Sequence, residues 1–349
     1  MDARALIVAG PGGLTVEARP TTRPRPHEAV IGVAYGGICG SDVHYWKDGR
    51  IGEFVLRTPM VLGHEVVGVV DRPAADGSGP EPGSRVAVHP AQVCGRCEYC
   101  RRGDQNLCAD LRYLGSAARV PHTDGGFADR IVVPASRLVP IPDALDTKTA
   151  ALAEPASVAL HALRRADRLG HSVEGGDVVV IGAGPIGLLV VAMAAASGAR
   201  TVTAIDIFDR PLRQAVQAGA THVARADTNA LVPAADIAIE SSGTPRGFTS
   251  AIEALRRGGV LVSVGHLPAG GVTAPLHLAV TRELTLAGSS RFYHEMPAAL
   301  SIMSHNVERF APIVTSVFAL DDAVAAFHEA ADADRSSKVL LSFTSAEER

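Results

Sequence analysis

Hydrophobic residues in roughly the first 150 positions come in short runs, separated by turns rich in Gly and Pro. Examples of these runs are residues 5–10, 29–37, 66–72, 84–90 and 128–134. Short strands with frequent turn signals between them are typical of a barrel-like or folded-sheet domain. The N-terminal part of the chain is therefore predicted to be a β-rich domain.

From about Ala151 the pattern changes, and apolar segments with a helical period alternate with short buried runs. The predicted helices are 151–166, 185–197, 210–220, 248–259 and 296–305. The predicted strands are 178–182, 201–206, 236–241, 260–265 and 284–289. This alternation indicates βαβ units and an α/β fold with a doubly wound parallel sheet. The apolar run 338–343 is a further strand that could rejoin the first domain.

Composition and charge narrow the class of protein. The 349 residues suffice for two domains with buried cores, and 47% hydrophobic and 20% charged residues are typical of a soluble globular protein. A net charge of −4 offers no electrostatic footprint for nucleic acid. The longest apolar stretch, 186–196, is too short to span a bilayer, and the N-terminus lacks a signal-peptide pattern. We expect a cytoplasmic protein without nucleic-acid or membrane partners.

A G-x-G-x-x-G motif directly follows the predicted strand 178–182 and opens a predicted helix. Its residues are Gly182, Ala183, Gly184, Pro185, Ile186 and Gly187. The glycines allow a tight turn and close approach of a pyrophosphate, whose phosphates the helix N-terminus can bind. Asp206, nineteen residues after Gly187, ends the next predicted strand, where an acid accepts the adenosine ribose hydroxyls. An acid there repels a 2′-phosphate, so NAD is favoured over NADP, although Arg210 could partly offset this preference.

Four of the five cysteines form a C-x2-C-x2-C-x7-C pattern. They are Cys94, Cys97, Cys100 and Cys108. This spacing lets one loop wrap four thiolates around a tetrahedral ion and leaves no position for water or substrate, as in structural zinc sites. An iron–sulfur cluster uses similar spacings and is the alternative. Disulfides are disfavoured by a reducing compartment and by the two-residue gaps.

The fifth cysteine, Cys39, lies fifty-five residues before Cys94 and belongs to a different pattern. It opens the segment 39–44, and His64 and Glu65 follow in a second segment. A thiolate, an imidazole and a carboxylate form a three-ligand set with an open fourth position, which is how a catalytic zinc site is built. Taken singly, Cys39 could be a small buried hydrophobe and His64 an ordinary turn residue.

Together these motifs resemble the zinc-dependent medium-chain dehydrogenases, and among them the polyol branch with the sorbitol, xylitol and L-idonate enzymes. The resemblance runs from about Ala5 to Leu341. Its motifs are ICGSDVHYW (38–46), PMVLGHEVVG (59–68), the four-cysteine segment, AEPASVALHA (153–162), GAGPIG (182–187) and GSSRF (288–292). It implies a GroES-like catalytic domain, residues 1–156 and 292–349, with a structural zinc lobe at about 94–108. Residues 157–291 would form the Rossmann domain.

The resemblance also implies roles for individual residues. Cys39 and His64 would bind the catalytic zinc, and both Glu65 and Glu154 stay open as the third protein ligand. Two zinc ions per chain and a homo-oligomer, dimer or tetramer, are expected.

The expected reaction is reversible, NAD-linked oxidation of a secondary alcohol. Ser41 occupies the position of the hydroxyl relay, and His44 the outer relay position, where a near-neutral pKa suits proton exchange with solvent. Glu154 is the third residue expected to take part in catalysis.

The substrate is expected to be a sugar acid. Segments 112–117, 121–127 and 288–292 look more like the L-idonate 5-dehydrogenase branch than like the polyol enzymes. A buried carboxylate needs a cation or several donors, and Arg291 and His122 are the candidates. The prediction is oxidation of L-idonate to 5-ketogluconate, with a sorbitol- or xylitol-type polyol as the alternative.

Two other classes are disfavoured. A metal-free quinone reductase shares this fold but lacks the Cys-His-Glu set and the four-cysteine lobe. A zinc-ribbon nucleic-acid-binding protein could use four cysteines, but the net charge of −4 and the complete dinucleotide motif argue against it.

Overall fold

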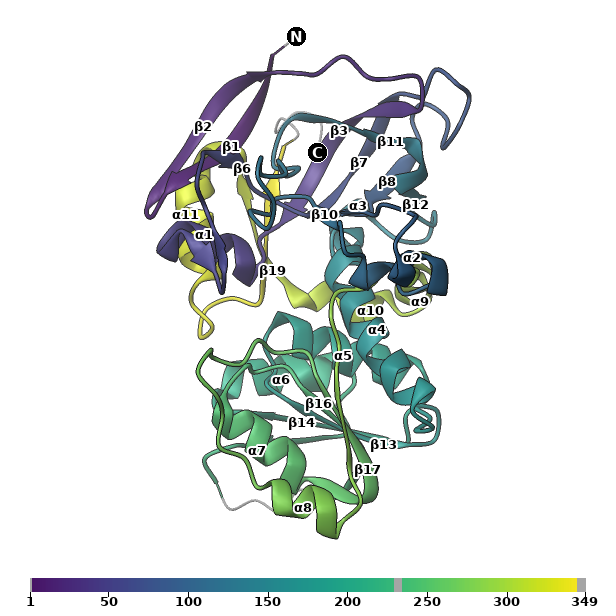
Figure 1. Cartoon of the computed structure of the whole chain (residues 1–349), viewed down its shortest axis with the longest axis vertical. Coiled ribbons are helices and arrows are strands. Elements are labelled where there is room, and N and C mark those ends of the chain that lie inside the picture. Colours follow the sequence, from purple (N-terminus) through teal and green to yellow (C-terminus); the bar gives the residue numbers. More distant parts are fainter. Residues whose placement is uncertain (1, 229–233, 344–349) are drawn as a thin grey trace. The chain divides into compact units, whose positions relative to one another are not determined.

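The structure is a computed structural model that describes residues 2–228 and 234–343. The chain divides into two compact units, Met1–Glu154 with Val314–Arg349, and Pro155–Ile313 (Figure 1). The second unit extends beyond the expected boundary at residue 291, because α10 (Val307–Phe310) packs on helices α5 (Pro185–Ala196) and α6 (Asp209–Ala218). The assignment of domains to these units stays a prediction.

The first unit is built on mainly antiparallel sheets, with a parallel pair formed by the two strands nearest the C-terminus. Its largest sheet has the order β12 (Leu138–Pro140), β8 (Arg85–Val88), β7 (Glu65–Arg72), β3 (Glu28–Gly37), β20 (Lys338–Ser342), β19 (Val314–Ala319), with β11 (Arg130–Pro134) also paired to β3. A second sheet has the order β2 (Gly13–Pro20), β1 (Asp2–Gly10), β6 (Met60–Val61). Two short ribbons pair β4 (Arg50–Ile51) with β5 (Phe54–Val55) and β9 (Ala91–Gln92) with β10 (Arg112–Tyr113).

The predicted β-rich first domain is confirmed, with strands at all five expected runs. Leu340, Leu341 and Ser342 of β20 pair with β3, so the prediction that the C-terminal run rejoins the first domain is also correct. Buried side chains of these strands, among them Ile31 and Val66, form one apolar core cluster. Helices α1 (Gly40–Asp48), α2 (Glu98–Arg102), α3 (Thr147–Ala150) and α11 (Ala323–Ala330) complete the unit.

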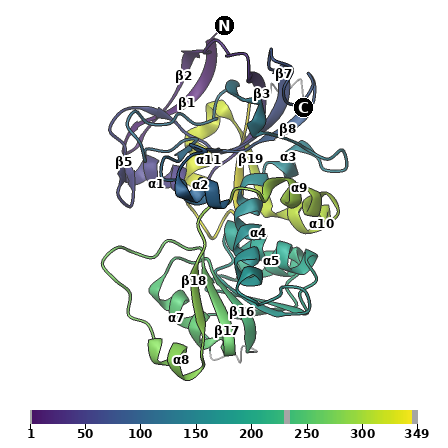
Figure 2. The ribbon, with the colours of Figure 1, turned by 45° about the vertical axis from the view of Figure 1, so that its right-hand side comes forward.

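The second unit contains a six-stranded parallel sheet. The order is β15 (His222–Arg225), β14 (Thr201–Asp206), β13 (Asp177–Ile181), β16 (Ala235–Glu240), β17 (Leu255–Ser263), β18 (Thr285–Gly288). If these six strands are numbered 1 to 6 along the chain, their order across the sheet is 3-2-1-4-5-6. This is the doubly wound arrangement that binds dinucleotides. The predicted α/β fold class is confirmed, and β16, β17 and β18 lie side by side in Figure 2.

The helices of this unit include α5, which is buried on almost every side. The others are α4 (Ala153–Arg168), which belongs to this unit from Pro155 on, α6, α7 (Pro245–Glu253), α8 (Leu276–Thr281), α9 (Met296–Ser304) and α10. The predicted helix 248–259 is wrong at its C-terminal end. The carbonyl of Ala254 accepts a hydrogen bond from the Ala235 N–H, so the helix stops and the chain enters β17. Strand β15 was not expected, because His222–Arg225 is short and largely exposed.

Candidate metal centres and dinucleotide site

The four cysteines of the 94–108 segment lie together in the structure, and all are free thiols. The Sγ atoms of Cys94 and Cys100 are 4.0 Å apart, as are those of Cys97 and Cys108. In a tetrahedral site with Zn–S bonds of about 2.3 Å, the sulfur atoms lie about 3.8 Å apart. The lobe therefore fits a zinc ion held by four thiolates.

Backbone N–H groups stabilise thiolates at this site. The Cys94 N–H donates to the Cys108 Sγ at 3.3 Å, and the Cys97 N–H to the Cys94 Sγ at 3.4 Å. Hydrogen bonds from the backbone of Ala109 and Cys100 lower the pKa of Cys97 to about 6. Burial raises the pKa of Cys100 to about 12, so this thiol needs a cation to become a thiolate at neutral pH.

Replacing Cys100 with serine is expected to lower the zinc content by one ion per chain and to lower the melting temperature by several degrees. The reason is that three ligands remain at a site whose binding free energy contributes to folding. Metal analysis and thermal unfolding measure both effects. Cys39→Ser is the comparison, since it removes a thiol from the other donor set and should cost activity rather than stability. An unchanged melting temperature for Cys100→Ser would contradict this assignment.

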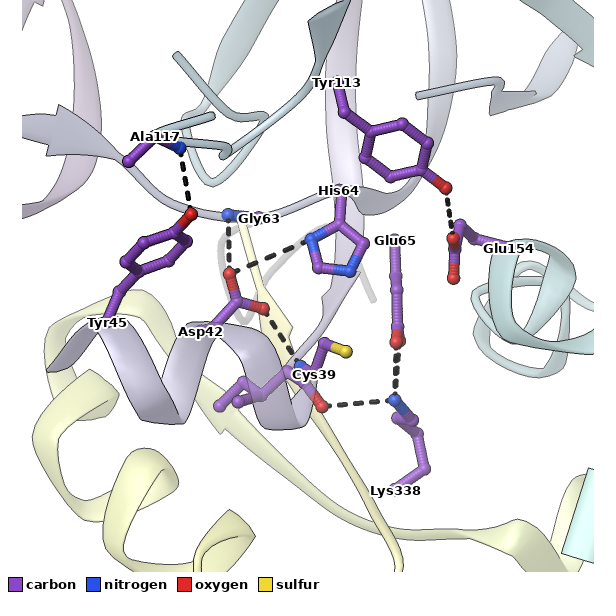
Figure 3. A network of polar contacts seen from close by, with 11 residues as sticks. Cys39, Asp42, Tyr45, Gly63, His64, Glu65, Tyr113, Ala117, Glu154 and Lys338 are labelled. Carbon is purple, nitrogen blue, oxygen red and sulfur yellow. Dashed lines mark hydrogen bonds and ion pairs between the residues drawn. The ribbon is translucent and has the colours of Figure 1, made fainter. Parts of the chain in front are cut away.

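A second donor set is formed by Cys39, His64 and Glu65 (Figure 3). Cys39 directly precedes α1, while His64 and Glu65 lie at the start of β7. One Sγ, one ring nitrogen and one carboxylate oxygen all lie within 4.8 Å of one another. A thiolate, an imidazole and a carboxylate suit zinc and leave a tetrahedral position open for another ligand.

Asp42 connects the segments that carry these donors. Its carboxylate is fully buried and accepts hydrogen bonds from the backbone N–H groups of Cys39 at 3.0 Å and Gly63 at 3.2 Å. Burial raises the pKa of Asp42. Burial lowers the pKa of His64, but the neighbouring Cys39 and Asp42 outweigh this effect and raise it. Asp42 therefore fixes the spacing between Cys39 and His64.

Glu65 forms a buried ion pair that the sequence did not reveal. The Lys338 Nζ lies 2.7 Å from each carboxylate oxygen of Glu65 and also donates to the Ile38 carbonyl at 3.1 Å. Burial alone would lower the pKa of Lys338, but the charge of Glu65 raises it. A Cβ on Gly37 would lie 2.1 Å from Glu65 Oε2, so only glycine leaves room for this carboxylate. One sequence signal was available, namely a lysine at the start of an apolar strand.

Glu154 lies near the start of α4 and is bound to a different residue. Its Oε1 accepts a hydrogen bond from the Tyr113 hydroxyl at 2.6 Å, and burial raises the pKa of Glu154. The Tyr113 ring centroid is 5.8 Å from that of His64. Among the described residues, Glu154 does not join the donor set of Cys39, His64 and Glu65. The choice between the two glutamates as ligand stays a prediction, and sequence reasoning missed Tyr113.

The two expected relay residues lie on α1. Ser41 is half-buried, whereas His44 is exposed, with its Nδ1 2.9 Å from Asp48 Oδ2. His122 has both ring nitrogens engaged with the backbone, because Nε2 accepts from the Arg57 N–H at 2.9 Å and Nδ1 lies 2.8 Å from the Arg119 carbonyl oxygen. Binding of substrate by His122 stays a prediction and would require one of these contacts to be given up.

The glycine motif in the second unit forms the expected turn between β13 and α5. Gly182 has φ +89°, and a Cβ on Gly187 would lie 1.8 Å from the Gly182 carbonyl oxygen. A Cβ on Gly184 would meet no atom within 4 Å. Two of the glycines are thus required by the backbone, and the third leaves open space where a pyrophosphate fits at the N-terminus of α5.

Asp206 lies beside this turn. Its Oδ2 accepts a hydrogen bond from the Ala183 N–H, and its Oδ1 from the Phe208 N–H at 3.0 Å. Arg210 Nη1 donates to Gln214 Oε1 at 2.7 Å. Strand pairing also places Arg225 next to Asp206, where Asp209 and Asp227 bind its guanidinium group. The acid expected at the ribose is therefore close to the glycine motif, as a dinucleotide site requires.

Comparisons with known proteins agree with this geometry. Residues 25–143 match the alcohol dehydrogenase GroES-like domain, and residues 185–305 match the zinc-binding dehydrogenase family. L-idonate 5-dehydrogenase (NAD(P)(+)) of Escherichia coli is 36% identical over 322 residues, which cover 90% of this chain and 91% of that protein. The chain belongs to the zinc-binding dehydrogenases. It is a zinc-dependent oxidoreductase that uses a nicotinamide dinucleotide.

Other members of the zinc-binding dehydrogenases are similar along nearly the whole chain. Human sorbitol dehydrogenase is 35% identical over 335 residues, covering 93% of this chain and 91% of that protein. The crystal structure of L-idonate 5-dehydrogenase from Escherichia coli has a TM-score of 0.92 at 33% identity, and 98% of each chain is covered. The expected family and fold are confirmed, and no helix among the described residues is long and apolar enough to cross a membrane.

Proposed function

We propose that this dehydrogenase oxidises a secondary alcohol of a sugar acid reversibly with NAD, and that L-idonate is converted to 5-ketogluconate. The main support is the 36% identity, over 90% of this chain, to a relative named L-idonate 5-dehydrogenase. The donor set Cys39, His64 and Glu65, with a tetrahedral position left open, supports the chemistry.

In the proposed mechanism Cys39 and His64 hold the catalytic zinc together with Glu65 or Glu154. When bound, zinc would supply Lewis acidity that lowers the pKa of the alcohol, and the nicotinamide would supply the acceptor for the hydride. Ser41 takes the proton from the alcohol oxygen and passes it towards His44. The imidazole of His44, whose side chain is 63% exposed, then exchanges the proton with solvent. Asp42 keeps Cys39 and His64 at a fixed spacing.

The substrate is tested by comparing kcat/KM for L-idonate, sorbitol and xylitol in the wild type and in Arg291→Ala. We expect the wild type to prefer L-idonate, and the variant to lose about 10- to 100-fold on L-idonate alone, the value of one charge-assisted hydrogen bond. Arg23→Ala, which removes an exposed arginine of the first unit, is the control. Equal or better oxidation of sorbitol by the wild type would instead favour a neutral polyol, the substrate class suggested by the sorbitol dehydrogenase relative.

Cofactor preference depends on Asp206. We expect Asp206→Asn to lower kcat/KM for NAD by about 10-fold and to raise the NADP-to-NAD ratio, because one acceptor for the ribose is lost and repulsion of a 2′-phosphate disappears. Asparagine keeps one oxygen that can accept from the Ala183 N–H. Asp209→Asn changes a neighbouring exposed acid and should leave the ratio nearly unchanged. A wild type that already strongly prefers NADP would contradict this role for Asp206.

We also propose a cytoplasmic homo-oligomer, a dimer or tetramer. Five free thiols suit a reducing compartment. Within the described residues β18 lies at one edge of the parallel sheet, and Leu286 on this strand is exposed. Leu276 and Val280 of α8 are exposed as well, at 55% and 83%. An apolar strand edge of this kind suits pairing with a second copy of the chain. Light scattering after size-exclusion chromatography gives the oligomeric state.

A further inference from the structure

Glu295 is a buried acid in the second unit that the proposed mechanism does not use. It directly precedes α9 and ends the loop 289–295 that follows β18. Its side chain is 2% exposed. One carboxylate oxygen, Oε2, accepts hydrogen bonds from the backbone N–H groups of Tyr293 and His294, both at 3.0 Å. The carboxylate therefore folds back on the loop that precedes it and holds two of its amides.

The other oxygen of Glu295 faces helix α4. Oε1 lies 3.0 Å from His161 Nδ1, with Arg164 Nη1 at 3.8 Å and Arg168 Nη2 at 3.7 Å. These three residues lie on one face of the helix. Burial opposes ionisation, but the hydrogen bond and charge of His161, the Tyr293 amide and the charge of Arg164 outweigh it and lower the pKa of Glu295 to about 2. An ionised carboxylate thus bridges the loop to α4.

The loop that Glu295 holds carries Arg291 in an unusual backbone conformation. Arg291 has φ +53°, in the left-handed region that side chains with a Cβ rarely adopt. The next residue, Phe292, is fully buried, and at the start of the loop the Ser289 N–H donates to the Ser263 carbonyl at 2.9 Å. Such a conformation persists only where the surrounding contacts fix it. Here the hydrogen bond of Ser289 on one side and the buried Phe292 on the other fix the backbone of Arg291.

The loop also lies at the edge of the sheet where ligands bind. Ser263 and Gly288 are paired at the carboxyl ends of β17 and β18. In doubly wound sheets the ligand lies outside the carboxyl ends of the strands. Residues of the loop that leaves β18 are therefore on the cofactor side of the second unit.

From these contacts we infer that Glu295 is a positioning residue, whose carboxylate holds the loop so that Arg291 is presented to the substrate. Its effect on selectivity for an acidic substrate rests on the proposed function. The hold of Glu295 on the loop that carries Arg291 does not depend on which alcohol the enzyme oxidises.

A double-mutant cycle tests this inference. In Glu295→Gln the side chain is neutral, and an NH2 group turned towards α4 meets the guanidinium groups of Arg164 and Arg168, which only donate. We expect kcat/KM for L-idonate to fall about 10-fold, mainly through KM, and about 100-fold in Arg291→Ala. The double variant should be no worse than Arg291→Ala, because Glu295 acts through Arg291. The inference would be overturned if the two single-variant losses of kcat/KM multiplied in the double variant, or if Arg291→Ala showed no loss.

Asp236→Asn provides the matched control. Asp236 is a second buried acid of this unit, 7% exposed, and accepts a hydrogen bond from the Asp177 N–H at the amino end of the sheet. Its replacement should lower stability without any coupling to Arg291. If Asp236→Asn shows the same coupling, the effect of Glu295 is merely structural and the inference fails.

Amide hydrogen exchange gives a readout that does not depend on turnover. In Glu295→Gln the amides of Tyr293 and His294 should exchange about 10-fold faster or more, while those of β13 keep their wild-type rates. Uniform acceleration throughout the second unit would overturn the inference. A wild type that prefers sorbitol would refute only the assignment of an acidic substrate, because the exchange of the Tyr293 and His294 amides does not depend on the substrate.

Discussion

Replacing His64 with alanine is expected to abolish turnover, by about 10³-fold or more, in a protein that stays folded. In the proposed site the imidazole is one of three donors to the catalytic metal, and the two remaining donors would hold zinc weakly. The four thiolates of Cys94, Cys97, Cys100 and Cys108 form a separate site, so that ion should stay bound. Metal analysis should therefore find one zinc ion per chain in the variant and two in the wild type.

His27→Ala is the control for this experiment, since His27 is an exposed histidine of the same unit. It should keep both zinc ions and full activity. A single zinc ion in fully active wild-type protein would refute the assignment of two sites. Near-normal activity in His64→Ala would refute the role of His64 as a ligand.

The second large effect is expected at the buried pair of Lys338 and Glu65. In protein whose Cys39–His64–Glu65 site is empty, Lys338→Met should lower the free energy of unfolding by about 3–5 kcal/mol, because it leaves a charged carboxylate buried without its partner. The two side chains are 2% and 1% exposed, so water cannot replace the lost ammonium group. Urea unfolding of the purified protein measures the change.

The double variant Glu65→Gln/Lys338→Met separates this cause from a simple packing defect. Removing both charges should recover most of the lost stability, because no unpaired charge remains. Arg4→Met breaks the exposed pair with Asp129 and should cost less than about 1 kcal/mol. A double variant that is no more stable than Lys338→Met would show that packing rather than charge is decisive.

Local patterns predicted those parts of the site whose residues are close in sequence. The four cysteines lie within one lobe, and their spacing alone indicated a tetrahedral site. The glycine motif and Asp206 belong to consecutive strands of one βαβ unit, so their proximity followed from the expected fold. The period of the apolar positions likewise predicted the parallel sheet of the second unit.

Contacts between distant segments could not be predicted in this way. Glu65 and Lys338 are 273 residues apart, and Tyr113 and Glu154 are 41 apart. Each pair depends on how segments distant in sequence meet in three dimensions, which no local spacing encodes. Sequence reasoning therefore identified both glutamates as candidate ligands but not the partner that holds each of them.

The pairing of β20 with β3 has a consequence for biosynthesis. The Ile38 N–H donates to the Val339 carbonyl at 2.9 Å, and Lys338 Nζ to the Ile38 carbonyl, so the segment before Cys39 is held by residues made at least 300 positions later. On the ribosome the second unit emerges before these residues do and can fold first. We therefore expect the catalytic metal to be loaded late, after β20 has left the exit tunnel. A nascent chain stalled before Lys338 would leave Glu65 without its counter-ion and should be a preferred target of proteolytic quality control.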